Sequence, residues 1–218
     1  MGFISDELEK EIRHDGFLDL EAYGVATESK EILDFFWHSP LLKKADLIDE
    51  AEALRFNDDK LSFFEVSVNS YFASVAADFI RQKLLKTGES FTFETVMSSP
   101  DKVEFLRRAK ARGYRIYLYY VATEDPKINI SRIQYRVRMG GHNVPKDKIT
   151  SRYRRSLELL MDAIGYTHRA YIFDNSGDQQ VWIAEITDGK LLEMKTENVP
   201  NWFKQAVLDN AKVNHDHG

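Results

Sequence analysis

The sequence contains no cysteine among its 218 residues. This absence excludes disulfides, thiol nucleophiles and zinc sites built on thiolates, and it is typical of a reducing compartment. The sequence also lacks an uncharged apolar run of about 18 residues, the length that would predict a membrane-spanning helix. Its opening residues, MGFISDELEKEIRHDG, are acidic and amphipathic, unlike a signal peptide. We therefore expect a cytoplasmic protein with no membrane partner.

A surplus of basic residues is missing as well, because the formal net charge is −5. Proteins that bind nucleic acid normally need a basic surface to neutralise phosphates, so we expect no nucleic-acid partner. RNA or DNA binding through one basic segment is a minor alternative. The 6 histidines show no H-E-x-x-H or similar paired spacing, which argues against a metal hydrolase.

That basic segment lies at residues 136–156 and reads RVRMGGHNVPKDKITSRYRRS. Helical spacing puts Arg132 and Arg136 on one face of a predicted helix, and Arg152 and Arg155 on one face of the next. The glycines of the segment end the first helix, and its proline begins the second. Guanidinium groups bind phosphate oxygens through two hydrogen bonds, so this helix–turn–helix arm is suited to closing over phosphates. The alternative is a solvated basic face that balances acidic segments elsewhere.

The order of the apolar runs predicts an α/β fold. The runs GFIS, SFTFETV, YRIYLYYVA and RAYIFDNS have the character of strands, and helical stretches separate them. A repeated strand–helix–strand order implies right-handed crossover connections and a parallel sheet. We therefore expect a parallel sheet flanked by helices.

Helical periodicity indicates where those helices lie. Residues 28–57 predict two helical stretches broken at Ser39-Pro40, because proline disfavours helix in the residue before it. Residues 67–87 have apolar positions at a helical period and end at a glycine. Further helices are predicted over 100–112 and, as one long helix or two, over 125–166.

The C-terminal part has a different pattern. Asp188-Gly189 separates two short apolar runs and predicts the turn of a β-hairpin. A final helix is expected near residues 200–212. We predict a single domain over residues 1–218, with a core of about 1–176, the hairpin and helix in 177–212 and a polar tail in 213–218.

Ligands of open parallel sheets bind at the carboxyl ends of the strands, so the residues that follow each predicted strand are candidates for a site. Those residues are Asp6, Glu94, Thr95, Thr123, Glu124, Asp125, Asp174 and Asn175. An acid at such a position can hold magnesium or act as a general base. The alternative for Thr123, Asp125 and Asp174 is a helix cap or a turn. The alternative for Asp6 is a helix N-cap, with Glu9 completing a capping box.

Residues 90–157 closely resemble the second half of the zeta-toxin family of P-loop kinases. The shared pattern is a strand that ends in Glu-Thr, a helix, a Gly-Tyr pair before an apolar run, then R-V-x-x-G-G-H-x-V-P and R-x-x-R-S. A weaker resemblance extends from Phe3 to about Asn175. The G-G-H-x-V-P string between arginines is long and unusual, so it is specific to the family.

The resemblance implies phosphoryl transfer from ATP, with Mg²⁺, to a small hydroxyl acceptor. The well-studied toxins of the family phosphorylate UDP-N-acetylglucosamine, a nucleotide sugar, and are neutralised by a small antitoxin protein. Protein groups in such a reaction act chiefly by placement and by charge compensation. The implied partners are therefore a nucleotide, a hydroxyl acceptor and an antitoxin.

The resemblance also implies roles for individual residues. Asp6 corresponds to the general base toward the acceptor hydroxyl, and Glu94 to the acid that assists magnesium or substrate positioning. Arg136, Arg138 and Arg152 resemble the lid arginines that stabilise charge on the transferred phosphoryl group. The remaining candidates are Arg132 and Asn175 for nucleotide binding, and Thr95 and His142 for the acceptor.

The sequence departs from the family at the phosphate cradle, G-x-x-x-x-G-K-[ST]. None of the 11 glycines begins such a string, and the only Gly-Lys pair is Gly189-Lys190 in the predicted hairpin turn. In the family the loop precedes the strand that is GFIS here. We therefore expect a truncated chain whose first strand and loop lie upstream of Met1, and which is inactive because ATP loses its main partners. The alternative is a non-catalytic remnant that acts as a binding or decoy module for an antitoxin-like partner.

The truncation has a consequence for folding. In the family the missing strand lies between the strands that are SFTFE and YRIYLYY here. Five buried apolar side chains would contribute about 7–15 kcal/mol, which is comparable to the stability of a whole domain. We expect these two strands to pair directly, to borrow a strand from a partner, or to leave the fold marginally stable.

Overall fold

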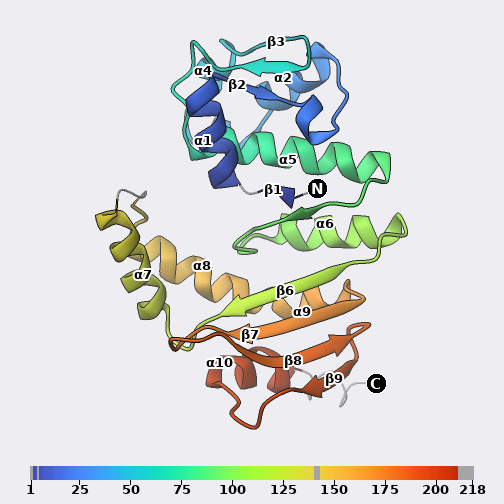
Figure 1. Cartoon of the computed structure of the whole chain (residues 1–218), viewed down its shortest axis with the longest axis vertical. Helices are drawn as coiled ribbons and strands as arrows, with labels where there is room; N and C mark the ends of the chain where they lie inside the picture. The colour runs from blue at the N-terminus through green and yellow to red at the C-terminus, as the bar shows by residue number, and fades with distance from the viewer. Residues whose placement is uncertain (1, 4, 140–142, 211–218) are drawn as a thin grey trace. The chain divides into compact units, whose positions relative to one another are not determined.

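The computed structural model describes residues 2–3, 5–139 and 143–210. The chain divides into two compact units, Met1–Thr95 and Val96–Gly218. We refer to them as the N-terminal unit and the C-terminal unit. Each unit has a core of its own, and Figure 1 shows the elements that form each.

The N-terminal unit is built around the helix α5 (Ser70–Thr87), as the apolar periodicity predicts. The Asn69 side chain caps this helix by accepting a hydrogen bond from the Tyr71 amide at 2.9 Å. Gly88 ends it in the left-handed conformation with φ 83°, which glycine adopts without steric cost. The buried face of α5 packs against α1 (Ser5–Asp15).

Short strands complete this unit. β1 (Gly2–Phe3) and β5 (Thr92–Phe93) form a parallel pair. β2 (Phe17–Asp19), β3 (Arg55–Asn57) and β4 (Lys60–Ser62) form an antiparallel sheet in the order β2-β4-β3, which the sequence pattern did not predict. Strands of three residues are too short for apolar alternation to be recognised.

The segment predicted as two helical stretches forms three helices. They are α2 (Ser29–Trp37), α3 (Pro40–Lys44) and α4 (Ile48–Ala51), preceded by a 3₁₀ turn at Glu21–Tyr23. The break at proline is confirmed, because Ser39 is the N-cap of α3 and Pro40 is its first residue. The prediction of helix up to residue 57 was wrong, since β3 begins at Arg55.

The C-terminal unit contains a four-stranded sheet in the order β6-β7-β8-β9. Its strands are β6 (Tyr117–Ala122), β7 (Arg169–Asp174), β8 (Val181–Thr187) and β9 (Leu191–Met194). β6 and β7 are parallel, while β7, β8 and β9 are antiparallel in succession. The predicted hairpin is confirmed, and Asp188 and Gly189 have φ of 52° and 69°, as a type I′ turn requires.

Helices precede, connect and follow these strands. α6 (Pro100–Ala111) precedes β6, and α7 (Pro126–Arg138), α8 (Lys146–Glu158) and α9 (Leu160–Gly165) connect β6 to β7. The predicted final helix is α10 (Asn201–Phe203), which continues into a π-helical turn at Lys204–Leu208. None of the described helices has the length and apolar character that a membrane crossing requires.

The two faces of this sheet differ. One face lies in the core, where Ile172 and Ala184 pack with residues of α9 and α10. On the other face Tyr119 stacks on Tyr171, with ring centroids 4.9 Å apart, and the aromatic row continues to Trp182 on β8. We call this second side the aromatic face.

The α/β class is therefore confirmed, with parallel pairs as predicted, but the pairs do not join into one parallel sheet. β5 and β6 lie in separate sheets, and among the described residues they do not pair directly. The prediction of one domain over residues 1–218 stays a prediction.

Candidate functional site

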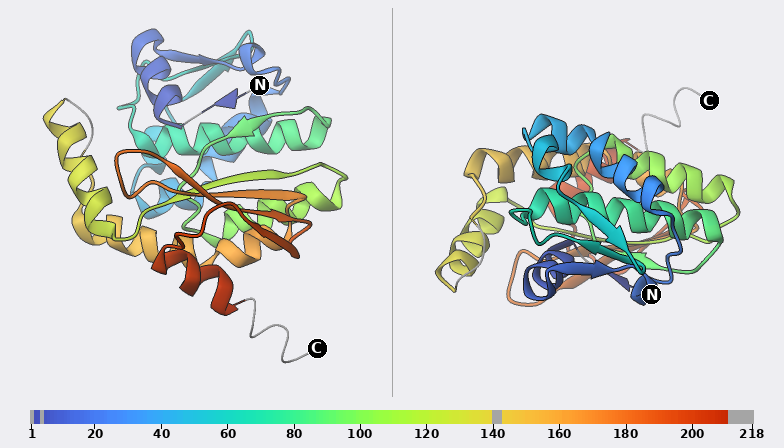
Figure 2. Two further views of the ribbon diagram at one scale, coloured as in Figure 1. Left: turned by 60° about the horizontal axis from the view of Figure 1, so that its bottom comes forward. Right: turned by 90° about the horizontal axis from the view of Figure 1, so that it is seen from above.

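The basic segment forms two packed helices, α7 and α8, which we call the arginine arm (residues 126–138 and 146–158). The Asp125 carboxylate caps α7 by accepting a hydrogen bond from the Lys127 amide at 2.7 Å. Pro145 is the N-cap residue of α8, as the sequence predicts. Both views of Figure 2 show α7 projecting from the edge of the sheet at which β6 ends. The arm therefore begins at a carboxyl end of the parallel strand pair.

The exposure and ion pairing of the arginines differ along the arm. Arg132, Arg136 and Arg138 are exposed on α7, and Arg152 is half-buried on α8. Within the described part of the chain, Arg138 and Arg152 have no carboxylate within ion-pair distance. These two guanidinium groups are available to an anion.

Two other arginines of the arginine arm bond to backbone carbonyls. The Arg155 Nε atom donates to the Ser98 carbonyl at 2.9 Å. The Arg132 Nη2 atom donates to the Gly177 carbonyl at 3.4 Å. Arg155 therefore has a structural contact, although its spacing from Arg152 predicts a shared face.

Hydroxyl groups fix α8 to the end of β6. The Tyr153 hydroxyl donates to the Thr123 carbonyl at 2.7 Å, and Ser156 and Tyr120 share a buried hydrogen bond of 3.0 Å. Burial, together with the nearby carboxylate of Glu124, raises the pKa of Tyr153 to about 12. Burial also raises the pKa of Tyr120 to about 12. Both phenols therefore remain protonated at neutral pH. Their hydrogen bonds hold α8, the helix that carries Arg152, against β6.

The polar residues at the ends of β6 and β7 have structural roles. The buried Asp174 carboxylate accepts hydrogen bonds from Trp202 Nε1 at 2.7 Å and from the Ser176 amide at 2.9 Å. The Thr123 hydroxyl accepts one from Asn129 Nδ2 at 3.0 Å. The capping alternative is confirmed for Asp125. Thr123 bonds to Asn129 of α7, and Asp174 holds both the loop at Ser176 and the helix α10.

Glu124 and Asn175 also lie at these strand ends. The Glu124 carboxylate accepts hydrogen bonds from the Asn201 amide at 3.0 and 3.2 Å. Asn175 follows β7, and its amide donates to the Ala122 carbonyl at 2.8 Å. The half-buried Asn175 therefore lies beside the end of β6, where the arm begins.

The remaining predicted residues lie in the N-terminal unit. Because β1 and β5 pair in parallel with Phe3 opposite Phe93, the residues after both strands emerge at one edge. Asp6 is in the first turn of α1, and Glu94 and Thr95 follow β5 directly; all three are exposed. Asp6 is not an N-cap, since α1 already begins at Ser5.

The predicted set thus divides into two groups, one in each unit. Asp6, Glu94 and Thr95 form the acidic group, and Arg132, Arg136, Arg138, Arg152 and Asn175 form the basic group. His142 lies outside the described residues. No three acidic or histidine side chains gather into a metal site anywhere in the described ranges, so magnesium binding by Glu94 stays a prediction.

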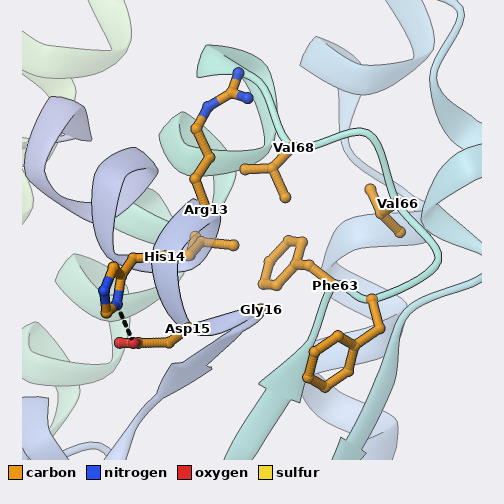
Figure 3. A pocket seen from close by; sticks show the side chains of 9 residues that line it. Arg13, His14, Asp15, Gly16, Phe63, Val66 and Val68 are labelled. Atoms are coloured by element: carbon orange, nitrogen blue, oxygen red, sulfur yellow. Dashed lines mark hydrogen bonds and ion pairs between the residues drawn. The ribbon is translucent and has the colours of Figure 1, made fainter.

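A pocket of about 390 Å³ lies elsewhere in the N-terminal unit, at the end of α1. Figure 3 shows Phe63, Val66 and Val68 in its wall, with His14 bonded to Asp15 beside it at 2.6 Å. None of the predicted site residues lines this pocket. No sequence motif predicts this pocket, because its walls come from two segments that are distant along the chain, residues 12–16 and 63–68.

Part of the chain is similar in sequence to known proteins. The model of the family described as Zeta toxin matches residues 57–187, which is more than half of the chain and includes both helices of the arginine arm. An uncharacterized protein of Haemophilus influenzae is 30% identical over 69 residues, which are 32% of this chain and 49% of that protein. The match thus spans about half the length of this curated relative. No solved structure matches the chain. On the extent of the family match, the protein belongs to the zeta toxin family.

Proposed function

We propose that the protein is a phosphotransferase that moves the γ-phosphoryl group of ATP to a hydroxyl of a small acceptor. The observation that supports this is the arginine arm, which lies within the segment matched to the zeta toxin family. Two of its arginines, Arg138 and Arg152, have no carboxylate partner among the residues described. Nucleotide sugars are the acceptor class to test first.

The arm would act on the charge of the reaction. A phosphoryl group in transfer carries negative charge on its oxygens, and guanidinium groups placed against those oxygens lower the barrier. Arg136, Arg138 and Arg152 would supply that charge. Arg132, one turn before Arg136 on α7, and Asn175 at the end of β7 would hold the nucleotide.

The acidic group would act on the acceptor. Asp6 would accept the proton of the attacking hydroxyl, and Thr95 and His142 would position the acceptor. Glu94 and Asp6 offer carboxylate oxygens at one edge, which are the donors that Mg²⁺ prefers. Glu94 would hold the ion, which when bound with ATP neutralises part of the phosphate charge.

The phosphate cradle distinguishes two forms of this proposal. The printed sequence has no G-x-x-x-x-G-K-[ST] string, so the backbone amides and lysine that normally hold the β- and γ-phosphates are missing from residues 1–218. We expect these residues alone to bind MgATP weakly and to transfer no phosphate. The second candidate is a binding or decoy module for an antitoxin-like protein, a role that requires no phosphate cradle.

Calorimetric titration of the 218-residue protein with MgATP tests the first candidate. A hydrogen bond to a charged group contributes about 1.5–3 kcal/mol, so Arg138→Gln or Arg152→Gln should weaken binding about tenfold to a hundredfold. Arg154→Gln is the matched control, because Arg154 is an exposed arginine of α8 outside the predicted set. Equal losses in all three variants would mean that only general charge matters. Absence of binding at millimolar MgATP would favour the decoy module.

A further inference from the structure

The loop that follows β7 contacts the point at which the arginine arm begins (Figure 1). We call its residues 175–177 the β7 loop. The Asn175 amide donates a hydrogen bond to the carbonyl of Ala122, the last residue of β6, at 2.8 Å. The Ser176 hydroxyl accepts one from the Glu124 amide at 2.7 Å. The β7 loop is therefore bonded to the stretch of chain on which β6 ends and the arm begins.

The partners of the Ser176 hydroxyl fix the direction of its hydrogen bonds. A backbone N–H can only donate, and a hydroxyl has one proton of its own to donate. Because Ser176 Oγ accepts from the Glu124 amide, its proton is left for the Asp174 carboxylate at 2.8 Å. That carboxylate also accepts from the Ser176 amide at 2.9 Å and from Trp202 Nε1 at 2.7 Å. One hydroxyl thus links the buried Asp174 to the start of the arm.

Both helices of the arm are attached beside Glu124. The helix α7 follows it along the chain, because Asp125 is the N-cap residue of that helix. The helix α8 reaches the same place through the Tyr153 hydroxyl, which donates to the Thr123 carbonyl at 2.7 Å and to the Glu124 carbonyl at 3.4 Å. The Glu124 carboxylate also accepts hydrogen bonds from the Asn201 amide at the start of α10. A shift of Glu124 would therefore move the origin of both helices.

We propose that Ser176 is a positioning residue of the arginine arm. Its hydroxyl holds the Glu124 amide and is itself held by the buried Asp174 carboxylate. The Gly177 carbonyl of the same loop accepts a hydrogen bond from Arg132 of α7 at 3.4 Å, so the β7 loop contacts the arm directly as well. The role rests on the proposed phosphotransferase function, because a fixed origin places the guanidinium groups where charge develops on the phosphoryl group.

Amide hydrogen exchange, followed residue by residue by NMR, tests this role on the 218-residue protein without any ligand. Ser176→Ala removes the hydroxyl, so protection of the Glu124 amide should fall about threefold to tenfold, the factor to which one neutral hydrogen bond corresponds. Protection in α7 should fall as well, while protection in β8 stays unchanged. Ser176→Thr keeps a hydroxyl and should restore the wild-type pattern. Ser151→Ala is the matched control, because the Ser151 hydroxyl donates to the Lys148 carbonyl within α8.

Calorimetric titration with MgATP separates this role from the proposed reaction. Where the wild-type protein binds MgATP, Ser176→Ala should weaken binding about threefold to tenfold, and Ser176→Thr and Ser151→Ala should not. Where the wild-type protein binds none, the phosphotransferase proposal fails, and the exchange experiment alone decides whether Ser176 holds the arm. The positioning role is overturned if Ser176→Ala leaves protection of Glu124 and α7 unchanged, or if it lowers protection in β8 by the same factor, as a general loss of stability would. Equal MgATP binding by Ser176→Ala and a binding-competent wild-type protein also overturns it.

Discussion

We expect the substitution Tyr153→Phe to loosen the arginine arm from the sheet. The Tyr153 hydroxyl donates to the Thr123 carbonyl at 2.7 Å, at the point where β6 ends and the arm begins. The substitution removes this one oxygen and leaves the half-buried ring in place, so it creates no cavity of note. The carbonyl of the buried Thr123 is left with one donor fewer.

The expected loss can be worked out from these contacts. A hydrogen bond between neutral groups contributes about 0.5–1.5 kcal/mol, and an unsatisfied buried acceptor costs about 1–3 kcal/mol. Since Tyr153 is half-buried and water can reach part of the site, we expect a loss of about 1–2 kcal/mol. For a chain of this size that corresponds to a fall in melting temperature of about 2–8 °C.

Urea unfolding followed by circular dichroism measures the loss, and amide hydrogen exchange locates it. Faster exchange in α8 than elsewhere is expected for Tyr153→Phe. Tyr135→Phe is the control, because the Tyr135 ring is exposed on α7 and its hydroxyl makes no hydrogen bond within the described ranges. A loss below about 0.3 kcal/mol for Tyr153→Phe, with unchanged exchange in α8, would refute the role of this hydroxyl as the anchor.

The same hydroxyl predicts a pH dependence. Burial raises the pKa of Tyr153 to about 12, above its ordinary value of 10.0. Between these two values the unfolded chain loses the proton while the folded chain keeps it, so stability is complete below pH 10 and falls as the pH rises toward 12. Tyr120 shifts in the same direction. The decline should be shallower in Tyr153→Phe than in the wild-type protein, as measured by urea unfolding at each pH.

Two further substitutions test other contacts. Trp202→Phe removes the indole N–H that bonds the Asp174 carboxylate at 2.7 Å, and it should cost about 1.5–3 kcal/mol in urea unfolding; a change near zero would contradict the anchoring role. The hydrogen bond from Lys83 lowers the pKa of Glu31. The stability from this pair is therefore present above the ordinary pKa of 4.5 and lost as the pH falls through the folded pKa. Melting temperatures of Glu31→Gln and wild-type protein should differ at pH 7 and converge in acid, and a constant difference would count against the pair.

Sequence reasoning predicted the elements whose signals are local. The helix α5 ends at the glycine that the pattern indicates, and α3, α6 and α7 each begin with proline. The strand β5 is shorter than the apolar run SFTFETV, because a strand extends only as far as its partner, and β1 has two residues. The sheet β2-β4-β3 could not be predicted, since three-residue strands have no recognisable period.

In the candidate site, too, the features with local sequence signals were predictable, and those that depend on distant contacts were not. The arginines of the arm were predictable because cations at helical spacing are visible in the sequence. The hydroxyl contacts of Tyr153 and Ser156 were not, because they depend on which strand lies beneath α8. Asp174 was ambiguous for a related reason. A carboxylate that follows a strand suits a ligand, and only the packing of Trp202 shows that it holds α10.

The two faces of the C-terminal sheet each carry one tryptophan as a built-in optical reporter. Trp182 lies on that face and is 40% exposed, while Trp202 packs against Tyr120 on the core side and is 3% exposed. Solvent around the first indole and an apolar surrounding for the second should separate their emission maxima and their quenching by iodide. With Trp37, the third tryptophan of the chain, replaced by phenylalanine, one fluorescence titration can report separately on events at the open surface and on the integrity of the core.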